Sequence, residues 1–139
     1  MTSVPAERLA SGLLDTSVFI AAESGRRLDA TSLPDQGFVS VITAAELEAG
    51  VHAAGATETR ARRLLTYQAA MRLELLPIDA VAAHHWATLR YRVGEAGRRI
   101  NVNDLWIAAI ALARRLPIVT QDDDFEVLTD LGGPVTVRV

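Results

Sequence analysis

Short apolar runs alternate along this chain with longer stretches of helical periodicity. The apolar runs, which predict strands, cover residues 12–15, 38–41, 75–78, 117–120 and 135–137. A first helix is predicted directly after Thr16. Further helices are predicted over residues 43–52, 57–72, 80–95, 104–115 and 124–128. Strands separated by helices indicate βαβ units, so we expect an α/β fold with a parallel sheet and helices on both of its faces.

Polar side chains mark the expected starts of several helices. Thr16 and Ser17 can cap the first helix, and Thr43 is expected to open the helix over residues 43–52. Asn103 is a good N-cap for the helix over residues 104–115. That helix carries the segment LWIAAIALA and is apolar nearly all round, which predicts a central, buried position.

Length and composition predict one domain. The chain has 139 residues, of which 50% are hydrophobic and 22% are charged, so one sizeable core can form. We expect a single domain over residues 1–139, with residues 1–11 as a short N-terminal extension. No apolar run reaches the ~18 residues that a membrane span needs. The first residues lack the basic start and long apolar segment of a secretion signal, so we expect a cytoplasmic protein that is not associated with a membrane.

The residue types that are missing exclude several classes of chemistry. The chain has no cysteine, which excludes disulfides, Cys-based zinc sites, iron–sulfur clusters and a Cys nucleophile. All 14 basic residues are arginine. Without lysine, a Walker-type phosphate loop and Schiff-base catalysis are excluded.

Acidic side chains stand at the edges of several predicted apolar elements. In a parallel α/β sheet, strand ends and the following helix starts share the edge at which ligands bind. The acids can therefore converge at this edge, although most of them are far apart in sequence. The acids in question are Asp15, Glu46, Asp104, Asp122 and Asp124. Converging carboxylates repel one another unless a cation lies among them, and oxygen-only ligands suit Mg²⁺ or Mn²⁺. This pattern indicates metal-dependent phosphodiester hydrolysis.

Each acid also has a purely structural interpretation. Thr43 and Glu46 fit a capping box, in which Glu46 would only hydrogen-bond the Thr43 amide. Asp104, expected as the first residue of its helix, could complement the helix dipole. Asp122 and Asp124 could belong to a solvated turn. For Asp15, a purely structural role is harder to find, because an acidic side chain at the end of an apolar strand does little for stability. Taken together, the five acids favour the functional interpretation.

The acids and their surroundings resemble the PIN-domain family, and within it the VapC-type toxins of bacterial toxin–antitoxin pairs. The matching stretches are LLDTSVFI (13–20), SVITAAELEAG (40–50), INVNDLWIAAIALARRLPIVTQDDDF (100–125) and the terminal GGPVTVRV. The resemblance implies a three-layer α/β/α sandwich around a five-stranded, mainly parallel sheet. It also implies an endoribonuclease that depends on Mg²⁺ or Mn²⁺, a VapB-type antitoxin partner, and a homodimer.

The family's site residues carry over to matching positions of this chain. Asp15, Glu46, Asp104 and Asp122 are the four catalytic acids, and the metal ligands are Asp15, Asp104, Asp122 and Asp124. Thr16, Ser17 and Thr120 are expected to hydrogen-bond these carboxylates. Asp123 falls outside the pattern.

Two arginines are the best candidates for holding RNA phosphates. Arg98 and Arg99 lie just before the Asp104 segment, although each could equally belong to a solvated, ion-paired face. A catalytically inactive PIN-like interaction module is the alternative to an active toxin. Replacement of one of the four catalytic acids would favour that alternative, and none is replaced.

Overall fold

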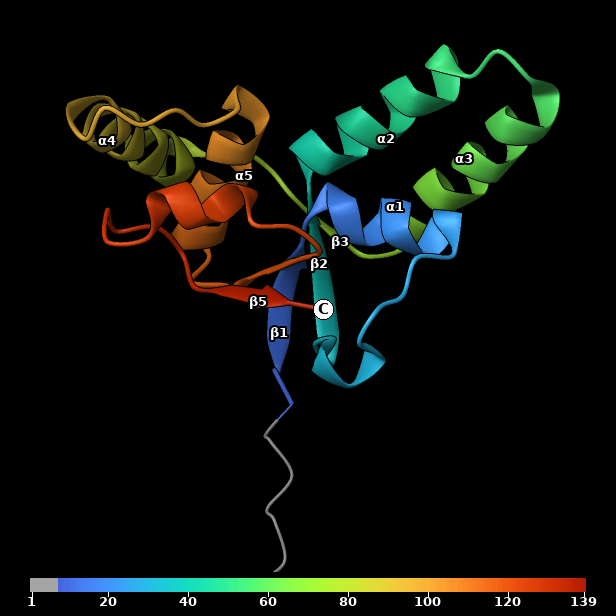
Figure 1. The fold of residues 1–139 in the computed structure, drawn as a ribbon, viewed down its shortest axis with the longest axis horizontal. Helices are drawn as coiled ribbons and strands as arrows, with labels where there is room; N and C mark the ends of the chain where they lie inside the picture. Colours follow the sequence, from blue (N-terminus) through green and yellow to red (C-terminus); the bar gives the residue numbers. More distant parts are fainter. Residues whose placement is uncertain (1–7) are drawn as a thin grey trace, which may run out of the picture.

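Five parallel strands form the central sheet of this protein (Figure 1). The structure is a computed structural model that describes residues 8–139. The strands are β1 (Ser11–Leu14), β2 (Gln36–Ser40), β3 (Glu74–Leu76), β4 (Ile118–Thr120) and β5 (Thr136–Arg138). They lie in the order β3-β2-β1-β4-β5, and every pairing is parallel. Residues 1–7 of the expected N-terminal extension lie outside the described residues, and β1 already begins at Ser11.

Helices cover both faces of the sheet, as the alternating pattern predicted. The α-helices are α1 (Thr16–Ser24), α2 (Val41–Ala53), α3 (Thr57–Ala70), α4 (Ala80–Glu95) and α5 (Val102–Ala113), and the 3-10 helices are η1 (Ala30–Ser32) and η2 (Asp124–Leu128). Figure 1 shows α4 and α5 on one side of the sheet and α1 and α3 on the other. The prediction of a three-layer α/β/α sandwich is confirmed.

The order of the strands places a switch point beside β1. From β1 the chain steps through α1 to β2 and through α2 and α3 to β3, and it then returns through α4 and α5 to β4 on the other side of β1. Right-handed crossovers in the two directions put the helices on opposite faces. In open α/β sheets, ligands bind beside such a switch point, outside the carboxyl ends of the strands, which here are the ends of β1 and β4.

The α5 helix lies at the centre of the core, as its apolar sequence predicted. Ile107, Ala108 and Ile110 are completely buried, and they pack in one cluster with Leu13 of β1 and Ile118 of β4. Burial of each large aliphatic side chain contributes about 1.5–3 kcal/mol. Within residues 8–139, no helix combines the length and the apolar character needed to cross a membrane.

Two helices begin two residues earlier than the sequence predicted. The N-cap of α2 is Ser40, whose hydroxyl accepts a hydrogen bond from the Thr43 amide at 3.1 Å, so Thr43 does not open this helix. The N-cap of α5 is Asn101, whose side chain accepts from the Asn103 amide at 2.8 Å. Asp104 is consequently the third residue of α5 and not the first. In both places a second residue able to cap lies earlier in the chain, and it takes the extended conformation that a cap requires.

Candidate active site

Asp104 lies among the other four predicted acids. Its carboxyl group is half-buried, and burial, followed by the charges of Asp15, Asp124, Glu46 and Asp122, raises its pKa to about 7. These charges act on Asp104 from three separate parts of the chain: the N-cap of α1, the α2 helix, and the segment from the end of β4 into η2. The structure thus brings all five predicted acids to the carboxyl edge of the sheet.

Asp15 is the most deeply buried of the five acids. It is the N-cap residue of α1, directly after β1, and only 4% of its surface is exposed. Burial, as the largest cause, raises the pKa of Asp15, and the charge of Asp122 adds to the rise. Hydrogen bonds from Ser17 and Thr120 to Asp15 Oδ2, at 2.8 and 3.1 Å, oppose it. A buried carboxyl group with this balance favours a cation as a neighbour.

Ser17 and Thr120 connect the ends of β1 and β4. The Ser17 hydroxyl accepts from the Gln121 amide at 3.0 Å, while the Thr120 hydroxyl lies 3.2 Å from Asp122 Oδ1. The hydrogen bonds expected from Ser17 and Thr120 to the acids are therefore present. They connect Asp15, which follows β1, with Asp122, which follows β4.

A chain of buried hydroxyl groups orients Glu46. The Thr16 hydroxyl donates to Glu46 Oε1 at 2.8 Å and lies 2.9 Å from the Thr43 hydroxyl, which in turn accepts from Ser40 at 3.4 Å. The capping-box interpretation of Glu46 was wrong, because Ser40 caps α2 and Glu46 instead accepts from Thr16. This use of Ser40 and Thr43 was not predicted from the sequence, although both lie at the start of the same helix.

Asp122 and Asp124 have different local roles. The Asp124 amide donates to Asp122 Oδ1 at 3.3 Å, so the Asp122 carboxylate also supports the turn that leads into η2. The pKa of Asp124 is raised by its partial burial and by the charges of Asp122 and Asp123. The N-cap position of η2 belongs to Asp123, whose side chain makes no capping hydrogen bond.

The donor set of the cluster suits a hard cation that keeps part of its water shell. All five side chains offer only oxygen, which Mg²⁺ and Mn²⁺ prefer. As the side chains of residues 8–139 stand, no three acidic or histidine groups are arranged to ligate a single ion directly. Asp15 and Glu46 each direct an oxygen toward a hydroxyl group. Mg²⁺ needs only one or two carboxylates together with waters, so the arrangement fits such an ion.

A groove adjoins the cluster between α1, α2 and α3. Its volume is about 310 Å³, and Thr16 and Glu46 form the end nearest the acids. The remaining lining residues are Ile20, Glu23, Leu47, Gly50 and Arg63. The groove therefore continues from the carboxylates over a mixed apolar and charged surface.

The two predicted RNA-binding arginines have different surroundings. Arg98 contacts Val127, Thr129 and Asp130 of the same chain. Arg99 lines a pocket of about 200 Å³ beside the start of α5. An RNA contact of either residue stays a prediction.

The chain belongs to the PIN-domain family, which residues 12–131 match. It is 52% identical over 130 residues to Ribonuclease VapC5 of Mycobacterium tuberculosis, covering 94% of this chain and 96% of that protein. It is also 43% identical over 119 residues to Ribonuclease VapC4 of the same organism, covering 86% and 92% of the two chains. The resemblance to VapC-type members of the family is confirmed.

A solved structure has the same fold. The crystal structure of VapBC-5, a member of the VapBC family of toxin–antitoxin systems from Mycobacterium tuberculosis, contains a chain that superposes with a TM-score of 0.83. That chain is 48% identical, and the match covers 94% of this chain and 98% of that one. The match therefore covers nearly the whole length of both chains.

Proposed function

We propose that this protein is the ribonuclease toxin of a VapBC-type toxin–antitoxin pair and that it cleaves structured RNA with the help of Mg²⁺ or Mn²⁺. The observation that carries the proposal is the convergence of four carboxylates on Asp104, whose pKa is raised to about 7 by burial first and then by their charges. Such repulsion costs folding free energy, and a bound cation would relieve it. The identity to two VapC ribonucleases over most of the chain supports the same reaction.

The acids divide into metal ligands and one orienting carboxylate. Asp15, Asp104, Asp122 and Asp124 would hold the ion, which when bound activates water and stabilises charge on the phosphate oxygens. Thr16 holds one oxygen of Glu46, so this carboxylate keeps a fixed orientation and can accept a hydrogen bond from a water molecule. Ser17 and Thr120 keep Asp15 in place between the two strands.

A brief pulse of expression followed by sequencing of RNA 5′ ends tests the function. We expect new 5′ ends at a small number of sites in transfer or ribosomal RNA, and their loss in an Asp15→Asn variant. An inactive interaction module would produce no new ends with either protein. Identical new ends from both proteins would show that another nuclease made the cuts.

The groove between α1, α2 and α3 is the place where we expect the antitoxin to bind. The carboxylate cluster attracts a guanidinium group, and an Arg of the partner can bond carboxylates bidentately. Ile20, which lines the groove, is 46% exposed, and α3 also carries the exposed side chains of Leu64 and Leu65, so apolar surface remains for a partner to cover. An antitoxin that binds both the carboxylate cluster and the groove would exclude the metal and the RNA together.

Replacement of Ile20 with Asp should weaken antitoxin binding about tenfold or more, since an apolar contact at the groove is replaced by a charge. Titration of the cognate antitoxin against both proteins measures the change. Val135→Asp is a matched control, because Val135 is 71% exposed and lies outside the groove. Equal affinities for the Ile20 and Val135 variants would contradict this binding mode.

Asp122→Asn should reduce cleavage more than Asp124→Asn. Asp122 lies directly beside Thr120 and near Asp15, whereas Asp124 belongs to the first turn of η2. We expect Asp124→Asn mainly to weaken binding of a second metal or the local helix, and to change the stability by about 0.5 kcal/mol or less, because Asn can still cap amides at a helix start. Cleavage rates and metal titrations of the Asp122→Asn and Asp124→Asn variants measure this difference, and Asp123→Asn is the control. A less active Asp124 variant would mean that the two roles are reversed.

A further inference from the structure

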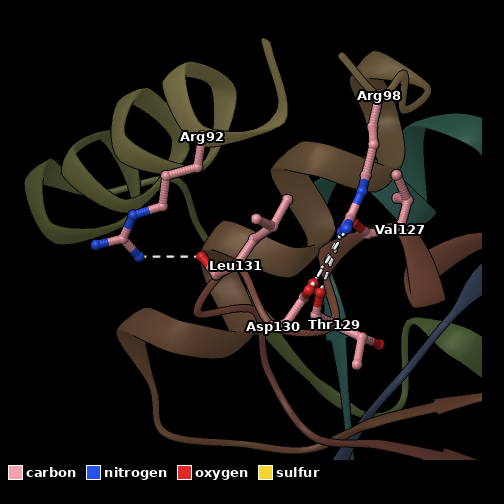
Figure 2. A network of polar contacts seen from close by, with 6 residues as sticks. All are labelled: Arg92, Arg98, Val127, Thr129, Asp130 and Leu131. Carbon is pink, nitrogen blue, oxygen red and sulfur yellow. Dashed lines mark hydrogen bonds and ion pairs between the residues drawn. The ribbon is translucent and has the colours of Figure 1, made fainter. Parts of the chain in front are cut away.

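Arg98 binds the segment that follows η2. It lies in the connection between α4 and α5, and its guanidinium points at residues 127–130 (Figure 2). Nη1 lies 3.1 and 3.2 Å from the carbonyl oxygens of Val127 and Thr129 and 2.9 Å from Asp130 Oδ1, and Nη2 lies 3.4 Å from Asp130 Oδ2. Carbonyl groups at the end of a helix lack partners within it and attract a cation. Arg98 therefore closes the carboxyl end of η2.

A second arginine holds the next residues of the same segment. Arg92, in the last turn of α4, donates to the Leu131 carbonyl oxygen at 3.0 Å (Figure 2). Gly132 has a φ of +84°, and a Cβ at this position would collide with the Arg92 guanidinium. Asp130 also adopts the left-handed region, with a φ of 66°. The chain thus makes a tight turn that the Arg92 and Arg98 guanidinium groups hold from one side through hydrogen bonds.

The held segment begins at the acids of the site. The short stretch from Asp122 to Asp130 is fixed at one end by Thr120 in the sheet and at the other by Arg98. Between these ends Phe125 and Leu128 are 2% and 1% exposed and pack in the core. Fixing both ends restricts how far η2 can rotate about these two core contacts, and with it the positions of Asp122 and Asp124.

From this arrangement we infer that Arg98 is a positioning residue: through Val127, Thr129 and Asp130 it holds η2 so that Asp122 and Asp124 stay at the carboxylate cluster. This inference rests on the proposed function, because it assigns Arg98 to the metal-binding side of the site. It differs from the RNA contact that the sequence predicted for Arg98. The ion pair with Asp130, which lowers the pKa of that carboxyl group, already balances the charge of Arg98.

Mn²⁺ titration of the RNA-free protein tests the inference. Loss of a group that hydrogen-bonds a ligand directly typically weakens metal binding 10–100-fold, and Arg98 acts one step further away. We therefore expect Arg98→Ala to weaken Mn²⁺ binding about threefold to tenfold and to lower kcat with little change in the KM for RNA. Arg98→Lys, which keeps the charge but not the forked contact, should lie between wild type and Arg98→Ala. Asp130→Asn should change Mn²⁺ affinity in the same direction as Arg98→Ala.

Amide hydrogen exchange of the metal-free protein provides a readout that needs no metal. The Asp124 and Glu126 amides donate to Asp122 and to the Asp123 carbonyl, and both bonds depend on the position of η2. In Arg98→Ala we expect these amides to exchange at least about threefold faster, while the melting temperature stays close to that of wild type. Arg99→Ala is the contrasting variant and should change neither exchange nor Mn²⁺ affinity.

Two results would overturn the positioning role. One is unchanged exchange at Asp124 and Glu126 in Arg98→Ala. The other is unchanged Mn²⁺ affinity together with a raised KM for RNA, which is the signature of a phosphate contact. A wild-type protein that binds no Mn²⁺ would instead contradict the proposed function, and the exchange measurement would still decide whether Arg98 positions η2.

Discussion

Asp15→Asn and Asp104→Asn are each expected to reduce RNA cleavage by about a thousandfold or more. Each change removes a negative charge from the centre of the cluster, and the loss corresponds to roughly 4 kcal/mol of transition-state stabilisation. Glu46→Gln should also remove most of the activity, because a neutral amide replaces the carboxylate that Thr16 orients. Cleavage of a defined RNA under single-turnover conditions measures these losses.

The matched control for these variants is Asp123→Asn. Asp123 carries the same charge and lies between two acids of the site, yet it falls outside the family's pattern and its side chain makes no capping bond. It should keep nearly full activity. Circular dichroism of all variants checks that the fold is intact. Asp15→Asn or Asp104→Asn with wild-type activity would show that the cluster is not the catalytic site.

Asp104→Asn is expected to stabilise the metal-free protein at neutral and higher pH. The folded-state pKa of Asp104 is about 7, whereas its ordinary value is 3.8. The folded protein therefore holds a proton that the unfolded chain releases, and wild-type stability falls as the pH rises from about 4 through 7. Asn carries no charge, so the variant escapes this loss. Because the coupled acids titrate together, the effect belongs to the whole cluster.

Thermal unfolding of wild type and Asp104→Asn in EDTA measures this effect. Asp104 is only half-buried, so solvent screens part of the repulsion, and we expect the variant to melt on the order of 3 °C higher at pH 8. The difference should shrink toward pH 5, where the wild-type carboxyl group is largely protonated. Asp123→Asn should show no comparable dependence on pH. A gap between Asp104→Asn and wild type that is the same at both pH values would argue against the raised pKa.

The fold could be predicted from the sequence because its signals are local and repeated. The apolar run before Asp15 and the nearly all-apolar α5 each identify a buried element, and their alternation predicts a parallel sheet. Convergence of the acids follows from that topology, since strand ends share an edge. The starts of α2 and α5 were misplaced because Ser40 and Asn101 compete with Thr43 and Asn103 as caps. Which of the two residues caps each helix depends on where the preceding segment leaves the extended conformation, and the sequence does not show this.

The family resemblance predicted that Thr16, Ser17 and Thr120 would hydrogen-bond the acids, but the sequence pattern could not predict which partner each side chain reaches. Thr16 reaches Glu46 across 30 positions, and Ser17 reaches the Gln121 amide across 104. Arg98 similarly contacts Asp130 across 32 positions. No periodicity or motif in the chain encodes such distant pairs of polar side chains. They emerge only when packing of the apolar core brings the strand ends, α2 and η2 together.

The most direct test of the account is cleavage of RNA by the purified protein with its divalent ions controlled. We expect cleavage with Mg²⁺ or Mn²⁺, complete loss in EDTA, and recovery when Mn²⁺ is added back in excess. Ca²⁺ should not restore activity, because its larger and looser coordination misplaces the attacking water in a site built of carboxylates. Cleavage that continues undiminished in EDTA would contradict the assignment of the Asp15, Asp104, Asp122 and Asp124 cluster as a metal-dependent active site.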